Sequence, residues 1–369
     1  MKSHTCIAVC ILFLALTLGG GCLEAVLGSC PPAEYPRIVP ADLAGPMQPA
    51  TFSYRFMNDA VTVTVPLDAG IYEGARNADK FAYLFEDLEE EEWLAGYYRA
   101  FVFDEHLDGL FAGLHDAFAS VRTTMDLDDD ECLELMAVFV QSLPYESDDA
   151  AGEPRFPIET IADGRGDCDD KSILLAGLLA REGYDVVLLF FKPEQHMAVG
   201  VRADGCSYGT TGYAFIETTN VSFVGVAPAA LEDGLAISSD PVVIRIGEGM
   251  KGYGRCDQTA YIDAALHDVL DRIASGEPDL RRAHDDLAAA YASLEELRTR
   301  MDTLAASGRI GEYNSLVPDY NRQVQEYNEQ LEEVSGRQNE YNRTIEVYNY
   351  IITHPHDRTG TYAWLREHA

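Results

Sequence analysis

Residues 159–172 read ETIADGRGDCDDKS and place Cys168 between a glycine-rich turn and a long apolar run. Glycine and aspartate ahead of an apolar run are typical of a turn that leads into a helix. A thiol in the first turn of a helix faces the positive end of the helix dipole, which favours the thiolate. The stretch therefore predicts a helix that begins near Cys168 and carries a nucleophilic cysteine at its start.

The sequence after Cys168 predicts a buried helix and then a buried strand. The helix should end at Gly183, and residues 185–191 form a continuous apolar run. Elements that are apolar on nearly all sides lie inside a domain, so this helix would be a fixed platform for the thiol. Further strands are expected at residues 196–202, 213–218 and 242–246. The pattern predicts an α+β fold in which the cysteine helix packs on an antiparallel sheet.

His196 opens one of these strands and is the expected partner of the thiol. Cysteine chemistry needs an imidazole that takes the proton and a third group that fixes the imidazole tautomer. His196 shares its face of the strand with Ala198 and Gly200, whose small side chains predict free space above the ring. If the strands pair across residues 204–212, Glu217 falls opposite Ala198 and within diagonal reach of the histidine. The sequence thus predicts a cysteine–histidine–glutamate triad.

Other residues are alternatives for parts of this site. Asp204 and Asn220 are alternatives to Glu217 as the third group. Asp167 or Asp169 could modulate the nucleophile, although acidic residues at a helix start are also expected for capping. A zinc site built from the cysteine, the histidine and nearby acids would lack the second closely spaced pair of ligands that tetrahedral zinc sites usually show. We therefore expect no metal and no cofactor.

Three short motifs resemble those of the transglutaminase-like family of thiol enzymes: GDCDD at 166–170, HMAV at 196–199 and FIETT at 215–219. The resemblance covers about residues 130–230 and is closest to membrane-anchored prokaryotic surface proteins, archaeal lipoproteins among them, whose substrate is unassigned. It implies a papain-like core with the triad in the order cysteine, histidine, acid. Relatives commonly carry aspartate followed by proline at the third position and tryptophan beside the histidine, whereas this chain has Glu217 and Met197.

The resemblance also implies an activity. Cys168 would be the nucleophile, His196 the base and then the acid, and Glu217 the group that orients the histidine. The backbone N–H of Cys168 would hold part of the oxyanion. With water as acceptor the enzyme is a cysteine peptidase or amidase, and with an amine it is a crosslinking transamidase. Hydrolysis of a peptide or protein substrate at the cell surface is the expected reaction, because no glutamine-binding or calcium apparatus is visible.

Composition restricts the classes of partner. The chain has 369 residues and 47% hydrophobic composition, which is enough to bury a core in two or three units. It carries 62 acidic and 27 basic residues, for a formal net charge of -35. A protein with this negative charge repels the phosphate backbone of nucleic acids. Nucleic-acid binding is therefore not expected.

The N-terminus resembles an export signal. Lys2 precedes an apolar run at 6–18, and three glycines then precede Cys22, which is the layout of a lipidation site. The alternative is a retained helix, although the run is shorter than the ~20 residues that a spanning helix needs. Either form places the body outside the cytoplasm, anchored to the cell membrane.

Six segments are expected along the chain: a signal and lipid-anchor segment (1–22), a proline-rich tether (23–50), an N-terminal α+β subdomain (51–125), the catalytic domain (126–256), a helical hairpin (257–353) and a C-terminal tail (354–369). Four cysteines lie outside the signal and the candidate site: Cys30, Cys132, Cys206 and Cys256. They permit three complete disulfide pairings, and the sequence does not choose between these.

Residues 278–353 carry two runs of heptads joined by a turn at Ser307–Gly308. The first arm has apolar residues at alternating three and four spacing from Leu280 to Leu304. The second arm has two expected seams, one of Val317, Val324, Leu331, Ile345 and Ile352 and one of Tyr320, Tyr327, Tyr341 and Tyr348. Such arms predict an antiparallel coiled coil.

The hairpin supports a second hypothesis of a different class. The folded body would be an inert scaffold, and residues 278–353 would bind a protein partner or self-associate, as in an adhesion or assembly module.

Overall fold

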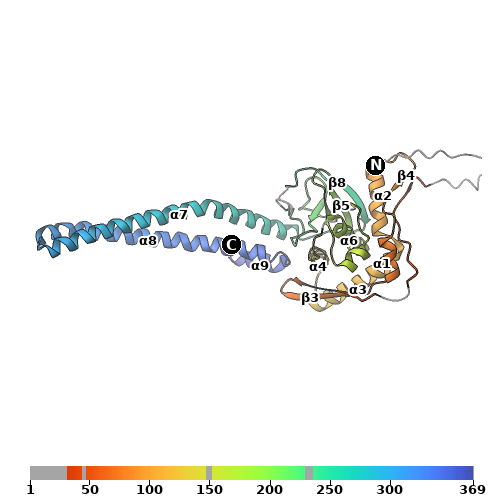
Figure 1. The fold of residues 1–369 in the computed structure, drawn as a ribbon, viewed down its shortest axis with the longest axis horizontal. Coiled ribbons are helices and arrows are strands. Elements are labelled where there is room, and N and C mark those ends of the chain that lie inside the picture. Colours follow the sequence, from red (N-terminus) through yellow and green to blue (C-terminus); the bar gives the residue numbers. More distant parts are fainter. Residues whose placement is uncertain (1–30, 44–46, 147–151, 229–235, 369) are drawn as a thin grey trace, which may run out of the picture.

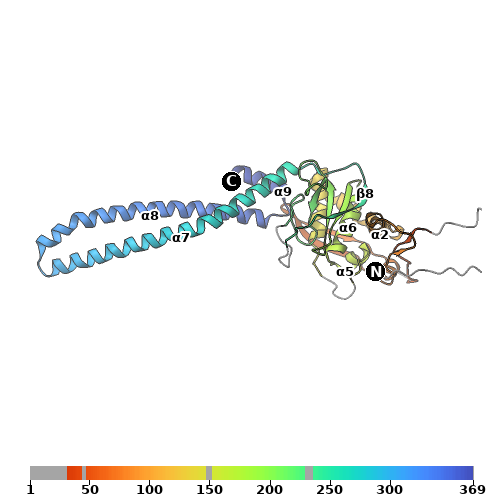
Figure 2. The same cartoon turned by 90° about the horizontal axis from the view of Figure 1, so that it is seen from above.

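The computed structural model describes residues 31–43, 47–146, 152–228 and 236–368, and Cys22 and Cys30 lie outside this part of the chain. A mixed α/β body occupies one end of the molecule, and a long helical hairpin projects from it in both views (Figures 1 and 2). Among the described residues, none of the helices combines the length and the apolar character needed to cross a membrane.

The centre of the body is a four-stranded antiparallel sheet in the order β7-β6-β5-β8. Its strands are β5 (Asp185–Phe191), β6 (His196–Arg202), β7 (Tyr213–Ile216) and β8 (Val242–Glu248). The antiparallel sheet and the start of β6 at His196 confirm the sequence prediction. Strand β7 ends two residues earlier than predicted, because the Glu217 carboxylate binds the backbone N–H groups of Thr218 and Thr219.

Helix α6 (Cys168–Arg181) packs on one face of this sheet, as predicted. Asp167 caps its first turn by accepting from the N–H groups of Asp169 and Asp170. Gly183, with a φ of 84°, follows its end, where a left-handed residue is typical of a helix terminus. Helices α4 (Asp129–Gln141) and α5 (Pro157–Asp163) complete the surroundings of α6.

The N-terminal part of the body is built around a β-hairpin of β2 (Ala50–Phe56) and β3 (Asp59–Val65). Val61, Val63 and Val65 share one face of β3, and all three are buried. The same part of the chain contains α1 (Ala69–Arg76), α2 (Glu90–Val102), a 3₁₀ turn (Glu105–Leu107) and α3 (Asp108–Met125). Helix α3 packs on β3, whereas α2 packs on β8 and α6.

Residues 78–89 are not helical, although their aromatic spacing favours a helix. Within them β4 (Tyr83–Leu84) pairs with β1 (Ala33–Glu34), which lies in the proline-rich segment. Ile38 of that segment is also buried in the core. Part of the expected tether therefore packs against the body.

Two long helices, α7 (Cys256–Ala306) and α8 (Ile310–Thr353), form the projecting hairpin. They meet at the predicted turn, where Gly308 has a φ of 75°. Helix α7 starts well before Pro278, which lies inside it. The tail predicted from residue 354 contains α9 (Arg358–His368), which packs back on α7.

The predicted seam of the hairpin is confirmed in the first arm and wrong in part of the second. Leu294, Met301 and Leu304 of α7 are buried. In α8, however, Leu331 and Ile352 are exposed. The buried positions of that arm are Val334, Thr344, Val347 and Ile351. A strict heptad drifts around a straight helix, and the break in the pattern near Val334 shifts the buried stripe.

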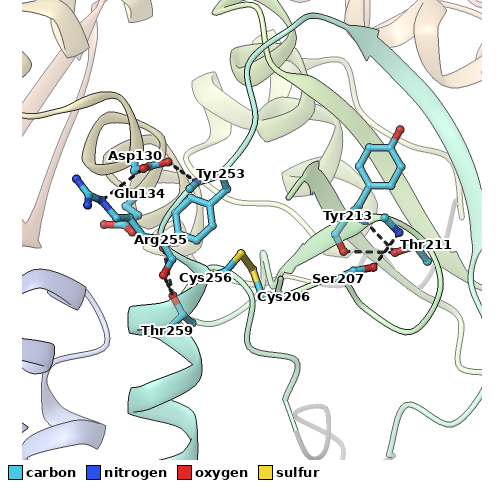
Figure 3. Close-up of a disulfide and its surroundings, with 12 residues drawn as sticks. Asp130, Glu134, Cys206, Ser207, Thr211, Tyr213, Tyr253, Arg255, Cys256 and Thr259 are labelled. Atoms are coloured by element: carbon cyan, nitrogen blue, oxygen red, sulfur yellow. Dashed lines mark hydrogen bonds and ion pairs between the residues drawn. A yellow bond between two sulfur atoms is a disulfide. The ribbon is translucent and has the colours of Figure 1, made fainter. Parts of the chain in front are cut away.

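A disulfide joins the hairpin to the sheet. Cys206 in the β6–β7 loop is bonded to Cys256, the first residue of α7 (Figure 3). Cys132 is a free, buried thiol. A second tie is a small apolar cluster at the base of the hairpin, in which Phe223 from the loop after β7 meets Ile262, Ile351 and Leu365.

Candidate active site

The structure brings the three predicted triad residues to one end of the sheet. Cys168 is the first residue of α6, His196 is the first residue of β6, and Glu217 directly follows β7. Val199 pairs with Ile216, so Glu217 falls next to the position of Ala198, which confirms the predicted register. All three triad side chains are buried, with exposed fractions of 8%, 5% and 2% respectively.

The histidine and the glutamate form a direct pair. His196 Nε2 lies 3.2 Å from Glu217 Oε2. The other carboxylate oxygen, Oε1, accepts from the N–H of Thr218 at 2.9 Å, and from the N–H and Oγ1 of Thr219 at 2.8 and 2.7 Å. Burial alone would raise the pKa of Glu217, but the bonds from His196 and Thr219 outweigh burial and lower it. The carboxylate is therefore ionised and fixed in orientation.

A fully buried lysine holds the loop that carries this carboxylate. Lys171 Nζ donates to the carbonyls of Leu143 at 2.7 Å, Thr219 at 3.2 Å and Gln141 at 3.3 Å. Gln141 Nε2 also donates to the Glu217 carbonyl at 2.7 Å. Sequence reasoning missed both residues. The available signal was a single lysine in an otherwise apolar helix, since a buried lysine needs partners.

The thiol is not hydrogen-bonded to the imidazole among the described residues. Two acceptors lie within range of the single thiol proton of Cys168, Asp169 Oδ1 at 3.4 Å and the Gln195 carbonyl at 3.9 Å. The backbone N–H of Met197 also interacts with the sulfur. Burial raises the pKa of the Cys168 thiol, and the carboxylates of Asp169 and Asp167 raise it further. The expectation that the helix start lowers this pKa is therefore wrong for this arrangement, because burial and two adjacent acids outweigh the helix dipole.

Strand geometry explains this separation. Met197 and Val199 belong to the core shared with α6, whereas Ala198 belongs to a second cluster on the opposite face of the sheet. His196 alternates with Met197 and so shares the face of Ala198. The ring of Phe191 lies 6.4 Å from its ring. His196 is buried rather than open to solvent, and Sγ lies against the backbone carbonyl of Gln195, the residue before the histidine.

Two carboxyl groups near the thiol, the partly buried Asp169 and the buried Asp170, have raised pKa values. Burial, followed by the charge of Asp167, raises the pKa of Asp169 to about 6. The same two causes raise the pKa of Asp170 to about 7, although the backbone N–H of Arg155 donates to Asp170 at 2.7 Å. Both groups therefore change charge near neutral pH.

The alternative candidates for the third group and for a metal site do not join this cluster as predicted. Asp204 and Asn220 are both exposed, and the position of third group is taken by Glu217. Within the described ranges, the potential metal ligands that come together are Asp167, Cys168 and Asp169, with ligand atoms within 4.8 Å of one another. The histidine is not part of that group.

Comparisons of the chain with protein-family models, with curated proteins and with solved structures found no match.

Proposed function

We propose that this chain is an extracytoplasmic thiol acyl-transfer enzyme with a transglutaminase-like core, and that it hydrolyses amide bonds of a peptide or protein substrate at the cell surface. The observation that carries the proposal is the ionised, four-fold hydrogen-bonded Glu217 facing His196, with Cys168 at the adjacent helix start. A buried carboxylate bound to Nε2 fixes the tautomer in which Nδ1 can accept a proton.

The reaction starts with a rotation of the Cys168 side chain toward His196. The thiol proton moves to Nδ1, and the imidazolium that forms is stabilised by Glu217. Sγ attacks the carbonyl carbon of the substrate, and the histidine gives its proton to the leaving amine. Water then attacks the thioester, which releases the acid and restores the thiol.

The helix start offers a donor for the oxyanion. The side chain of Asp167 accepts hydrogen bonds from the N–H groups of Asp169 and Asp170. In the described part of the chain the N–H of Cys168 has no acceptor of its own. A backbone donor adjacent to the nucleophile is the usual place for oxyanion stabilisation.

The disulfide supports an extracytoplasmic location. Bonds such as Cys206–Cys256 persist in oxidising compartments and are rare in the cytosol. Lipidation of Cys22 is part of the same proposal, and that residue lies outside the described residues.

The test is the alkylation of Cys168 by iodoacetamide in the full chain, followed by mass spectrometry of its peptide, with and without His196→Ala. We expect the substitution to slow alkylation at pH 7 by about tenfold or more, because a change of one unit in the thiol pKa changes the thiolate fraction tenfold. Buried Cys132 reports unfolding, and His267→Ala on exposed helix α7 is the matched control. Equal rates in parent and His196→Ala would overturn the proposal.

The projecting hairpin favours a second candidate function. Its two arms extend away from the body in both views (Figures 1 and 2), which is a geometry suited to reaching a partner. An adhesion or assembly module would keep its binding after Cys168→Ala, whereas an enzyme would lose turnover. A transamidase would attach an added primary amine to the peptide substrate, and the product mass would distinguish this from hydrolysis.

A further inference from the structure

The thiol of Cys168 lies between two hydrogen-bond acceptors and apart from its proposed base. We propose that Asp169 is a positioning residue that keeps Cys168 in a resting, protonated orientation, and that the thiol must leave Asp169 before it can reach His196. This inference rests on the proposed function and adds a control step to it.

The contact distances define the resting orientation. Asp169 Oδ1 lies 3.4 Å from Sγ, and the Gln195 carbonyl lies 3.9 Å from it. A thiol has one proton to donate, so both acceptors select the protonated form. A thiolate in the same place would face a carboxylate and a carbonyl oxygen, and both would repel it. The backbone N–H of Met197 favours the thiolate, but burial and the charges of Asp169 and Asp167 outweigh it.

The backbone at Gln195 is arranged for this contact. Gln195 has a φ of 50°, in the left-handed region that non-glycine residues rarely adopt. It directly precedes His196 and presents its carbonyl oxygen to the sulfur. Left-handed residues of this kind cost free energy and cluster at functional sites.

The groups around Asp169 determine its effect. Asp167 and Cys168 face it from α6, His196 faces it from β6, and Tyr97 faces it from α2. Tyr98 of α2 also lies close, and burial keeps both tyrosines neutral by raising their pKa values. Of these groups only His196 can become positive, and Glu217 already pairs with it. The charge of Asp169 therefore acts mainly on the sulfur in direct contact.

Release of the thiol changes one bond at a time. The hydrogen bond from Sγ to Asp169 breaks, the Cys168 side chain turns, and the proton passes from Sγ to His196 Nδ1. Neutralisation of Asp169, by a proton or by a cationic group of the substrate, removes the acceptor charge that opposes this step.

The test compares Asp169→Asn with Asp167→Asn in the full chain, by the rate of Cys168 alkylation between pH 5 and pH 9. Each variant removes one negative charge next to the sulfur, but only the first removes a group in contact with it. Asparagine also caps a helix well, so the second variant keeps the helix start. We expect Asp169→Asn to raise the rate at pH 7 by about three- to tenfold and to lower the midpoint of the pH profile by about half a unit to one unit. Asp167→Asn should give a smaller shift.

An unchanged or slower rate in Asp169→Asn would overturn the inference, and so would equal shifts in the two variants. Asp169→Ser repeats the measurement if the first variant unfolds, and alkylation of Cys132 detects unfolding. His196→Ala in each background separates the two proposals. If His196→Ala has no effect in the parent, the proposed function fails. If it has an effect while Asp169→Asn has none, only the role of Asp169 fails.

Discussion

Glu217 lies in an environment unlike that of an ordinary surface acid. Its pKa is lowered although it is buried, because His196 and the backbone after β7 supply hydrogen bonds that stabilise its charge. In the sequence, the expected strand register favoured Glu217 over Asp204 and Asn220. The distinguishing feature is the set of donors that the loop folds around it.

We expect Glu217→Gln to slow Cys168 alkylation at pH 7 by about 10- to 100-fold, since hydrogen bonds to a charged group contribute ~1.5–3 kcal/mol. The amide keeps the shape of the carboxylate and loses its charge. Thr219→Val removes only the hydroxyl donor and should have a smaller effect. Rates are measured by mass spectrometry of the Cys168 peptide. A rate equal to the parent in Glu217→Gln would show that the pair is structural.

The sequence predicted the pairing of His196 with Glu217 but not the contacts of the Cys168 sulfur. Strand alternation and register placed Glu217 beside His196, because both follow from a period of two. The contacts of Cys168 depend instead on the backbone of residue 195 and on which face of the sheet α6 covers. Lys171 and Gln141 bind carbonyls distant in the chain, and no local pattern encodes such partners.

Helices α4 and α9 are tied together by a buried ion pair that adds a pH dependence to stability. Glu134 accepts from Arg358 Nε, and from Tyr253 OH at 2.6 Å. Burial raises the pKa of Glu134 to about 7, although Arg358 opposes the shift. A carboxyl whose pKa is raised on folding stabilises the folded state most when protonated. That contribution is lost as the pH rises through 7.

We therefore expect the free energy of unfolding to fall by about 1–2 kcal/mol between pH 6 and pH 8 because of this group, with Asp170 acting in the same direction. Glu134→Gln should flatten the profile, whatever it does to the absolute stability. Urea denaturation at several pH values measures the slope. Asp286→Asn, at an exposed position of α7, is the matched control. A slope unchanged by Glu134→Gln would contradict the raised pKa.

The disulfide fixes the start of α7 to the β6–β7 loop across a sequence separation of 50 residues. A crosslink that closes a loop of this size stabilises by about 4 kcal/mol in the chain-entropy model. We expect the double variant Cys206→Ala and Cys256→Ala to lose about this much free energy of unfolding in urea. Reduction of the parent should give a similar loss, and a loss below about 1 kcal/mol would show that the crosslink hardly constrains the unfolded chain.

Heptad spacing identified the hairpin as a whole and its first arm residue by residue. The buried positions of the second arm were harder to predict, because tyrosines and aliphatic residues both recur at heptad spacing and Val334 interrupts the repeat. Burial there follows the crossing of two particular helices, which the spacing in one helix does not determine.

The projecting hairpin has a distal part remote from the active site and a base that is connected to the site. At the base, Phe223 packs against α7, α8 and α9. The preceding residue, Ser222, accepts from Gln141 Nε2 at 3.2 Å, and the same nitrogen donates to the Glu217 carbonyl. A path of direct contacts therefore leads from the base of the hairpin to the proposed catalytic acid.

The distal part and the base of the hairpin should therefore respond differently to mutation. His284 Nε2 and Gln338 Oε1 lie 3.3 Å apart across the hairpin, so residues 285–337 can be replaced by a short glycine-containing turn. We expect this variant to keep Cys168 alkylation within about twofold of the parent, because the base cluster and the disulfide are intact. Phe223→Ala should slow alkylation, since it loosens the loop that holds Glu217, and should cost ~3–5 kcal/mol of stability at most.

Alkylation rates and thermal unfolding of both variants are compared with the parent. Loss of thiol reactivity in the truncated chain would place part of the active site in the distal hairpin, where the structure shows no contact with the described triad residues. Retained reactivity combined with loss of binding to a surface partner would instead assign the distal arms to delivery of the enzyme. The two functions proposed for the chain would then occupy opposite ends of one molecule, joined at the base cluster.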